Sequence, residues 1–501
     1  MKKTISELIK SYQEKMQFAR AFQYALWMIG WDTETEAPRG ALEERSLHVG
    51  TLSRELHNFT TSPETIDLIQ ELFDRRDELD SRLQIEIKKT HKSLMRQLKV
   101  PVDEYVEYQM LLAKTQNIWA QAKNNNDYNA FKPYLEKIIS FERKLISYWE
   151  TDKLKGYDVL LDLYEEGMTA KEYDEFFAAL KKDLVPFVKE ITSLPKREFP
   201  FLRLSYDIDK QKAFSHYIMD VMMFDRNRGL MKESEHPFTS GVTSQDVRWT
   251  NHFHEKLITS SIFSAIHELG HATYEQQCNP ELDKTNLGGG ASMAMHESQS
   301  RFYENIIGRS PAFWNVHFAK LRELFPSQLK DVTAEEWVKA VNLVENSLIR
   351  TEADELTYPL HIMVRYDMER AIMKQELSAD ELPGEWNRLM KSYLNIDVPS
   401  DKEGVLQDVH WSGGMFGYFP TYALGSAYAA QIYHAMKQDF DVDASLSAGN
   451  TQAINEWLKQ KIHWHGATKT AKELIMEATN EPFNPKYYID YLKTKYQAIY
   501  R

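Results

Sequence analysis

Helical periodicity over most of the first 155 residues is the feature that most restricts the fold. Apolar residues recur there three and four positions apart with charged residues between them, which is the pattern of amphipathic helices that bury one face. Four segments carry the pattern: Ser6–Ala25, Ala41–His57, Pro63–Leu98 and Lys132–Leu154. Only 20 glycines and 17 prolines interrupt the 501 residues. Long helices are therefore favoured over a turn-rich β-sandwich.

Local signals place several ends of these helices and very few strands. Pro63 marks a helix start, since proline is tolerated in the first turn, and Val100-Pro101 and the polar patch 123–127 predict breaks. Residues 199–206 alternate partly between apolar and polar, and residues 247–254 alternate more clearly. No repeat, low-complexity segment or flexible linker is present. We expect a mainly α protein with one small β-sheet, formed by residues 1–501 as a single domain.

Composition excludes several classes of protein. The chain is 43% hydrophobic, which suffices for a large core, and 61 basic against 74 acidic residues give a net charge of −13. This balance argues against binding to nucleic acid or to an anionic membrane surface. Its one cysteine, Cys278, excludes a disulfide framework and a multi-thiolate metal site. The polar start MKKTISELIK has no apolar stretch typical of a secretory signal, so we expect a cytoplasmic protein.

One stretch, Met415–Tyr433, has no charged residue over 19 positions and is long enough to span a bilayer. It contains Gly417, Pro420 and Gly425 together with four tyrosines, a composition poorly suited to hydrocarbon. We interpret the stretch as a buried loop and helix beside a pocket.

The chemistry is indicated by a His-Glu-x-x-His motif. His267 and His271 are four residues apart, so on a helix they project from one face within reach of a single ion, and Glu268 lies beside them. Glu297 follows 26 residues after His271, beyond a Gly288–Gly290 turn that lets a second helix fold back. Two histidines and a downstream glutamate form a thermolysin-type ligand set for one catalytic Zn²⁺ per chain.

His296 is the rival to Glu297, because neighbours on a helix point about 100° apart and only one of the pair is expected to ligate. We favour Glu297, since no metzincin-type continuation follows His271. A structural role or a substrate contact remains open for His296. With this ligand set, the metal activates a water molecule, and Glu268 acts as general base in hydrolysis of an amide. Cys278 as a nucleophile is the weaker alternative.

Five further segments, together with this motif, resemble the carboxypeptidase Taq family of metallocarboxypeptidases. They occur in family order: His236-Pro237-Phe238, Asp246–Thr250, His296–Gln299, Ile349–Asp354 and Gly404–Trp411. The resemblance implies a two-lobed helical fold with a deep active-site groove, a zinc or cobalt ion on its floor, and a homodimer. It implies removal of C-terminal residues from peptides with broad specificity, usually sparing proline. It places a helical lid in residues 1–100 and the catalytic motifs in residues 236–411.

An exopeptidase needs a cation to hold the terminal carboxylate, and arginine suits bidentate recognition. Arg350 is the first candidate. We expect it in a helix that starts at Thr333 with a Glu336 capping box, with Asp354 orienting it. Arg248 is the second candidate, although Asp246 two residues earlier equally suggests a structural ion pair.

Four aromatic or imidazole side chains are candidates for stabilising the tetrahedral intermediate: His236, His410, Tyr418 and Tyr422. The alternative function is an endo-acting oligopeptidase on the same scaffold, which would need no carboxylate clamp. A catalytically inactive peptide-binding protein is disfavoured because both histidines and Glu268 are present.

Overall fold

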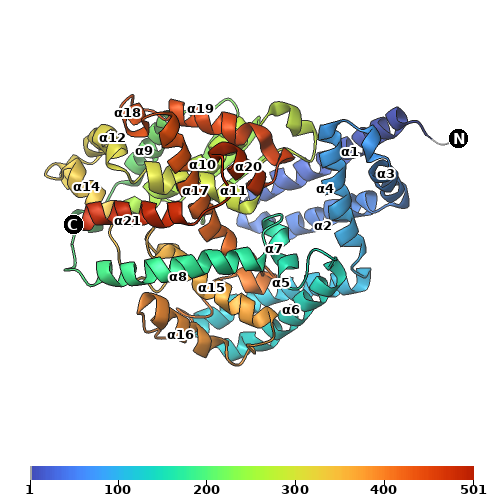
Figure 1. The fold of residues 1–501 in the computed structure, drawn as a ribbon, viewed down its shortest axis with the longest axis horizontal. Helices are drawn as coiled ribbons and strands as arrows, with labels where there is room; N and C mark the ends of the chain where they lie inside the picture. Colours follow the sequence, from blue (N-terminus) through green and yellow to red (C-terminus); the bar gives the residue numbers. More distant parts are fainter. Residues whose placement is uncertain (1–2) are drawn as a thin grey trace.

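The computed structural model describes residues 3–501, and most of them lie in helices (Figure 1). The N-terminal region consists of four helices at one end of the molecule: α1 (Ile5–Thr35), α2 (Leu42–Thr60), α3 (Pro63–Asp74) and α4 (Ser81–Leu98). The helical pattern of residues 63–98 is confirmed, but it is divided between two helices, because the chain breaks between Asp74 and Ser81. Asp80 caps the new helix by accepting a hydrogen bond from the Leu83 amide at 2.9 Å.

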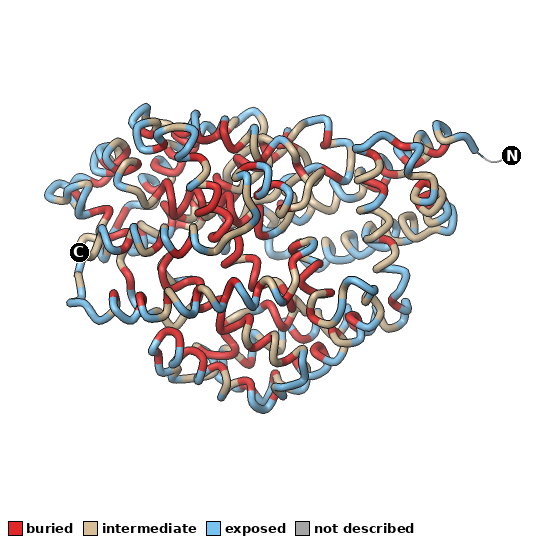
Figure 2. The backbone as a smooth tube through the Cα atoms, viewed as in Figure 1, coloured by how far each residue is buried: buried red, intermediate tan, exposed pale blue. Residues whose placement is uncertain are grey.

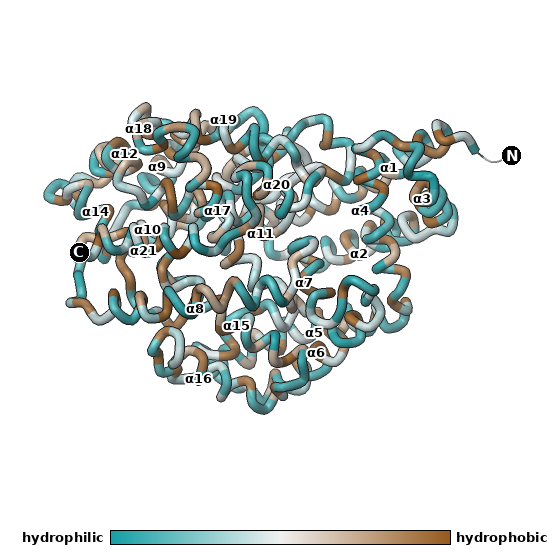
Figure 3. The backbone as a smooth tube through the Cα atoms, in the orientation of Figure 1, coloured by the Kyte–Doolittle hydropathy of each residue, from teal (hydrophilic) through white to brown (hydrophobic). Residues whose placement is uncertain are grey.

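Five helices follow, before the sheet: α5 (Val102–Asn125), α6 (Tyr128–Trp149), α7 (Asp158–Tyr164), α8 (Ala170–Thr192) and α9 (Ile208–Val221). Pro63 and the breaks near residues 101 and 126 lie where the sequence predicts them. Asn126 ends α5 in the left-handed conformation, which asparagine tolerates better than most residues. Figure 3 shows polar and apolar residues alternating along α8, as expected for an amphipathic helix.

The sheet has three strands, β1 (Gly229–Glu233), β2 (Thr239–Thr243) and β3 (Asp246–Asn251), in the order β1-β3-β2. Strand β1 is parallel to β3, and β2 is antiparallel to it. The second segment expected to form a strand therefore does so over residues 246–251. The expectation for residues 199–206 is wrong: Pro200 opens a short 3₁₀ turn, Pro200–Arg203, because its fixed φ suits the first turn of a helix.

Most of the rest of the chain is helical. It comprises α10 (Ile258–Gln277), α11 (Met293–Arg301), a π-helical turn (Phe302–Ile307), α12 (Pro311–Leu324), α13 (Pro326–Leu329), α14 (Ala334–Val341), α15 (Tyr358–Met373), α16 (Leu382–Leu394), α17 (Phe419–Asp439), α18 (Val442–Leu446), α19 (Gln452–Lys461), α20 (Ala471–Thr479) and α21 (Lys486–Tyr500). In Figure 1, α5, α6, α15 and α16 lie in the lower half and α9–α12 and α17–α21 in the upper half. No helix within residues 3–501 is long and apolar enough to cross a membrane.

Burial is concentrated where α10, α11 and α17 meet (Figure 2). Two glycines let these helices approach closely. A Cβ on Gly270 of α10 would lie 2.8 Å from the Gln299 carbonyl oxygen of α11, and one on Gly425 of α17 would lie 2.8 Å from Cβ of Glu297. Residues 8–94 form a separate small core of ten buried side chains. The body is therefore packed around α11, the helix that carries Glu297.

Candidate metal centre

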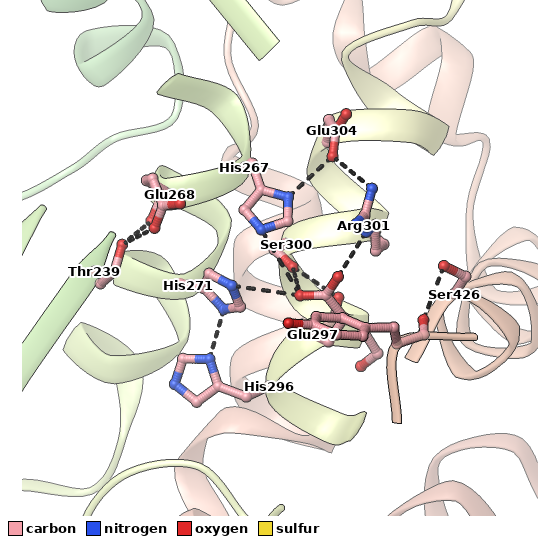
Figure 4. Close-up of polar contacts among 12 residues, drawn as sticks. Thr239, His267, Glu268, His271, His296, Glu297, Ser300, Arg301, Glu304 and Ser426 are labelled. Carbon is pink, nitrogen blue, oxygen red and sulfur yellow. Dashed lines mark hydrogen bonds and ion pairs between the residues drawn. The ribbon is translucent and has the colours of Figure 1, made fainter. Parts of the chain in front are cut away.

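His267 and His271 on α10 face Glu297 on α11 (Figure 4). Nε2 of His267 lies 3.7 Å from Oε2 of Glu297, and Nε2 of His271 lies 3.6 Å from the same oxygen. One donor atom from each residue falls within a 4.8 Å cluster. The loop before α11 turns at Gly289, whose φ of +81° is unfavourable for other residues, and Ser292 caps α11 by accepting a hydrogen bond from the Met295 amide at 3.1 Å.

The outward nitrogens of both histidines are already engaged. Nδ1 of His267 lies 2.9 Å from Oε2 of Glu304, and Nδ1 of His271 lies 2.5 Å from Nδ1 of His296. His296 in turn places Nε2 2.6 Å from Oε1 of Glu275. These contacts leave two imidazole Nε2 atoms and one carboxylate oxygen facing each other, which is the donor set of a His₂Glu metal site. The residues present therefore fit a divalent ion.

Glu304 and Glu297 are surrounded by arginines. Arg309 Nη2 lies 3.0 Å from one oxygen of Glu304, and Arg301 Nη1 lies 3.3 Å from the other. Burial favours protonation of Glu304, but Arg301, the hydrogen bond from His267 and Arg309 outweigh it and hold its pKa well below the ordinary value. Arg301 also donates to Oε1 of Glu297 at 2.7 Å. Glu297 thus has Oε1 fixed by Arg301, while Oε2 accepts from the Ser300 hydroxyl at 3.1 Å and faces the histidines.

Glu268 lies next to the two histidines but outside this cluster. Its side chain is buried, with 7% of the residue exposed, and the Thr239 hydroxyl on β2 lies 2.7 Å from its Oε2. Burial raises the pKa of Glu268, while His267 and Thr239 oppose the shift. A buried carboxylate with a raised pKa is well suited to accept a proton during a reaction.

The structure corrects the expected setting of Arg350. Thr333 does cap helix α14 and forms the capping box with Glu336, but the helix ends at Val341. Asn342 follows, and its side-chain amide donates to the Val338 and Arg309 carbonyls at 2.8 and 2.9 Å. Arg350 instead opens a separate 3₁₀ turn, Arg350–Glu352.

Asp408 holds Arg350, and the expectation that Asp354 would do so is wrong. Nε and Nη2 of Arg350 each lie 2.9 Å from Oδ1 of Asp408. Asp354 turns its carboxylate to the start of α15, where it accepts from the amides of Leu356 and Thr357. Arg350 Nη1 donates to the Tyr358 hydroxyl at 3.0 Å. Arg350 is nearly buried, with 7% of the residue exposed.

Aromatic residues lie around Arg350 and extend towards the metal centre. The Arg350 guanidinium carbon lies 5.1 Å from the centroid of the Tyr422 ring, and His410 Nε2 lies 3.3 Å from the Tyr422 hydroxyl. Tyr418 packs edge-on against Tyr422 at 5.3 Å. Tyr358 links the two regions, because its ring lies 4.4 Å from Arg301, which holds Glu297. The structure therefore brings His410, Tyr418 and Tyr422 together with Arg350.

Comparison with known proteins decides the family. A sequence model of the carboxypeptidase Taq (M32) metallopeptidases matches residues 11–496. The chain belongs to this family. It is 41% identical to carboxypeptidase 1 of Bacillus subtilis (strain 168), over 98% of each chain, and 33% identical to thermostable carboxypeptidase 1 of Thermus thermophilus, over 98% of this chain and 99% of the relative. The crystal structure of the M32 carboxypeptidase from Deinococcus radiodurans R1 superposes with a TM-score of 0.95 at 32% identity, covering 99% of both chains.

Family membership makes the protein a metallocarboxypeptidase, a peptide hydrolase that uses a divalent metal, and the mainly helical fold agrees with its structural neighbours. In this M32 carboxypeptidase a cavity of about 780 Å³ opens beside His296 and runs between α4, α5 and α7. Tyr164 lines it and packs edge-on against Tyr418 at 5.0 Å. The cavity thus adjoins the metal centre through His296 and the Tyr418–Tyr422 pair through Tyr164.

Two of the candidate residues lie elsewhere in the M32 carboxypeptidase. Arg248 on β3 pairs with Asp246 at 2.7 and 2.9 Å, and its guanidinium lies 4.8 Å from the ring of Trp27 on α1. His236 is exposed in the loop between β1 and β2. Neither is brought into contact with the Arg350 cluster among residues 3–501.

The sequence reasoning missed Glu275, Arg301, Glu304, Arg309 and Tyr358. Two of these carry a usable signal. Arg301 follows Glu297 by four residues and Glu275 follows His271 by four, which places each pair on one helix face. Glu304 follows Arg301 by three residues, but its contact with His267 joins residues 37 positions apart and has no such signal.

Proposed function

We propose that the protein removes single residues from the free C-termini of peptides with broad specificity, usually sparing C-terminal proline. His267, His271 and Glu297 would hold one Zn²⁺ or Co²⁺ per chain. A divalent ion held there supplies Lewis acidity, which polarises the scissile carbonyl and lowers the pKa of water. The choice of zinc follows from the two imidazole nitrogens and one carboxylate oxygen of the donor set.

Glu268 is the proposed general base. It takes a proton from the attacking water and passes it to the leaving amine, so no covalent intermediate forms. Two features of the site support this role. The carboxylate is buried beside His267 without belonging to the ligand cluster, and the Thr239 hydroxyl at 2.7 Å keeps it in place. His410, Tyr418 and Tyr422 are the proposed donors to the developing oxyanion.

The observation that carries the exopeptidase assignment is an excess of positive charge in the buried cluster around Arg350. Asp408 pairs with Arg350 through Oδ1 and with Arg365 through Oδ2, at 2.9 and 2.7 Å. Two guanidinium groups therefore share one carboxylate. A terminal carboxylate entering this buried region would balance the charge, and without such a cation its desolvation would go uncompensated. An endopeptidase has no need of this arrangement.

The proposal includes the setting in which the reaction takes place. The net charge of −13 and the absence of basic blocks favour peptide substrates over nucleic acid or membranes. We further propose a cytoplasmic homodimer, as the family resemblance implies, in which residues 1–100 form a lid over the groove and residues 236–411 supply the catalytic motifs.

Digestion of one peptide of mixed sequence, followed by mass spectrometry, tests the function. A ladder of single C-terminal losses is the expected result, with one metal ion per chain by elemental analysis and activity lost to a chelator. Internal fragments would replace this assignment with an endo-acting oligopeptidase. A ladder that survives complete removal of the metal would refute the catalytic use of the metal.

A further inference from the structure

A second cavity, of about 450 Å³, lies between α17, α18 and α21. Its lining contains none of the three residues that fit a metal ion, and neither Glu268 nor Arg350. It nevertheless lies close to the metal centre, because Arg309 lines the cavity and bonds to Glu304, which in turn contacts His267. Its volume is in the range of pockets that hold small organic molecules.

Most charged groups that line this cavity already have partners. Arg309 pairs with Glu304 at 3.0 Å, Lys495 with Glu355 at 2.6 Å, and Lys486 with Asp490 at 2.7 Å. Two groups of opposite sign do not: Lys437 on α17 and Asp443 on α18 make no ion pair anywhere in the described part of the chain, and both are exposed. One unpaired cation and one unpaired anion therefore border the same pocket.

The same lining contains four aromatic or imidazole side chains, Tyr433, His434, Tyr487 and Tyr491. Tyr433 and Tyr491 pack edge-to-face at 6.3 Å, and the His434 ring lies 4.4 Å from that of Tyr487. The Lys437 ammonium sits 4.4 Å from the Tyr433 ring centroid. Burial raises the pKa of Tyr433 to about 12, so its hydroxyl keeps its proton at neutral pH and can donate a hydrogen bond. The pocket combines flat apolar surface with one charge of each sign.

We propose that this cavity binds a free α-amino acid with a large apolar side chain. The carboxylate pairs with Lys437, the ammonium group with Asp443, and the side chain packs against Tyr433 and Tyr491. A simple anion or cation would leave one of the two charges unmatched, and a small polar amino acid would leave the aromatic walls without contact. The ligand belongs to the same chemical class as the product that a carboxypeptidase releases, but its binding does not depend on Arg350 or on the proposed direction of cleavage.

Isothermal titration of the metal-loaded protein with L-phenylalanine tests the site. Two matched ligands each lack one charge: N-acetyl-L-phenylalanine and L-phenylalaninamide. Lys437→Glu and Asp443→Lys should each lower the affinity of this site for L-phenylalanine at least tenfold. The double variant, in which the two charges are exchanged, should regain most of that affinity. Lys182→Glu is the control, since Lys182 is likewise exposed on a helix and makes no ion pair among residues 3–501. Unchanged binding in both single variants, or equal binding of all three ligands, would overturn the proposal.

A crystal soaked with L-4-bromophenylalanine separates this cavity from the metal centre, where a product can also bind. The expected result is an anomalous bromine peak between α17 and α21 that disappears in Lys437→Glu. Peaks confined to the metal-centre groove would overturn the proposal, whatever the titration gives. Failure of the proposed cleavage direction leaves this result unaffected, so the two proposals fail separately.

Discussion

The N-terminal helices α1–α4 and the body around α10, α11 and α17 are stabilised differently. The N-terminal region has a small core of its own, and α2 buries no residue completely. Its contacts to the body are largely polar. Lys92 on α4 bridges Asp162 and Glu166 at 2.8 Å each, and Arg96 lies 2.6 Å from Asp162.

The body, by contrast, is close-packed around its functional groups. Glycines lie where its helices cross, and arginines bond to Glu297 and Glu304 beside the metal centre. Buried packing tolerates little change. The ion pairs of α4 are half-buried, since Lys92 and Arg96 share the buried carboxylate of Asp162, and salt weakens them only where solvent reaches them. The metal centre should therefore be rigid, and the N-terminal region, which is held by a few ion pairs, should move relative to it at a lower free-energy cost.

The largest effect should come from Glu268→Gln. The amide keeps the shape of the side chain but cannot accept the proton, so kcat should fall by about 10²–10⁴-fold while the metal stays bound. His267→Ala should instead lose the metal, because two protein ligands rarely retain zinc. Activity assays with metal analysis of both variants provide the check. Substantial activity of Glu268→Gln at full metal occupancy would show that Glu268 is not the base.

Removing a ligand should weaken metal binding more than removing its hydrogen-bond partner. Glu297→Ala should lower zinc affinity by more than about 100-fold, and His296→Ala by about 10–100-fold, because His296 contacts Nδ1 of His271 and faces the ion only through it. Competition with a chromophoric chelator measures both affinities. The reverse order would make His296 the third ligand.

A pair of glycine substitutions compares the packing of the two regions directly. Gly425→Ala places a methyl group 2.8 Å from Cβ of Glu297 and should lower the free energy of unfolding by about 1–3 kcal/mol. Gly30→Ala in α1 meets nothing within 4 Å and should raise helix stability by about 0.5–1 kcal/mol. Thermal unfolding of both variants is the measurement. If both substitutions destabilised the protein equally, the packing contrast would be wrong.

The smallest effect concerns the polar contacts of α4. Lys92→Ala should increase amide hydrogen exchange in α4 and leave metal affinity unchanged, and added salt should act in the same direction on the wild type. Lys10→Ala is the control, because Lys10 makes only a long, exposed contact with Glu14 on its own helix. Exchange that is insensitive to both Lys92→Ala and salt would mean that these ion pairs do not hold α4 in place.

The sequence was most informative where a function depends on short spacing. His267, Glu268 and His271 lie within one helical turn of one another, and capping signals at Pro63 and Thr333 mark real helix starts. It was least informative for contacts between distant segments. Asp408 lies 58 residues after Arg350, and no local spacing indicates the pair. The prediction therefore named the nearby acid Asp354, which was the wrong partner. The predicted length of a helix was wrong where a polar side chain ended it, as at Asn342. The spacing of apolar residues does not show that such a side chain competes for the backbone carbonyls of the helix.

The most direct test of the account is the cleavage of a peptide and its C-terminal amide by the wild type and by Arg350→Ala. Bidentate, charge-assisted hydrogen bonds from Arg350 should contribute about 2–4 kcal/mol, or roughly 30- to 1,000-fold in kcat/KM. The wild type should therefore strongly prefer the free acid, and Arg350→Ala should lose that preference while keeping its metal. Equal cleavage of acid and amide by the wild type would contradict the proposed mode of attack. An acid preference that survives Arg350→Ala would contradict the role of Arg350 as the clamp.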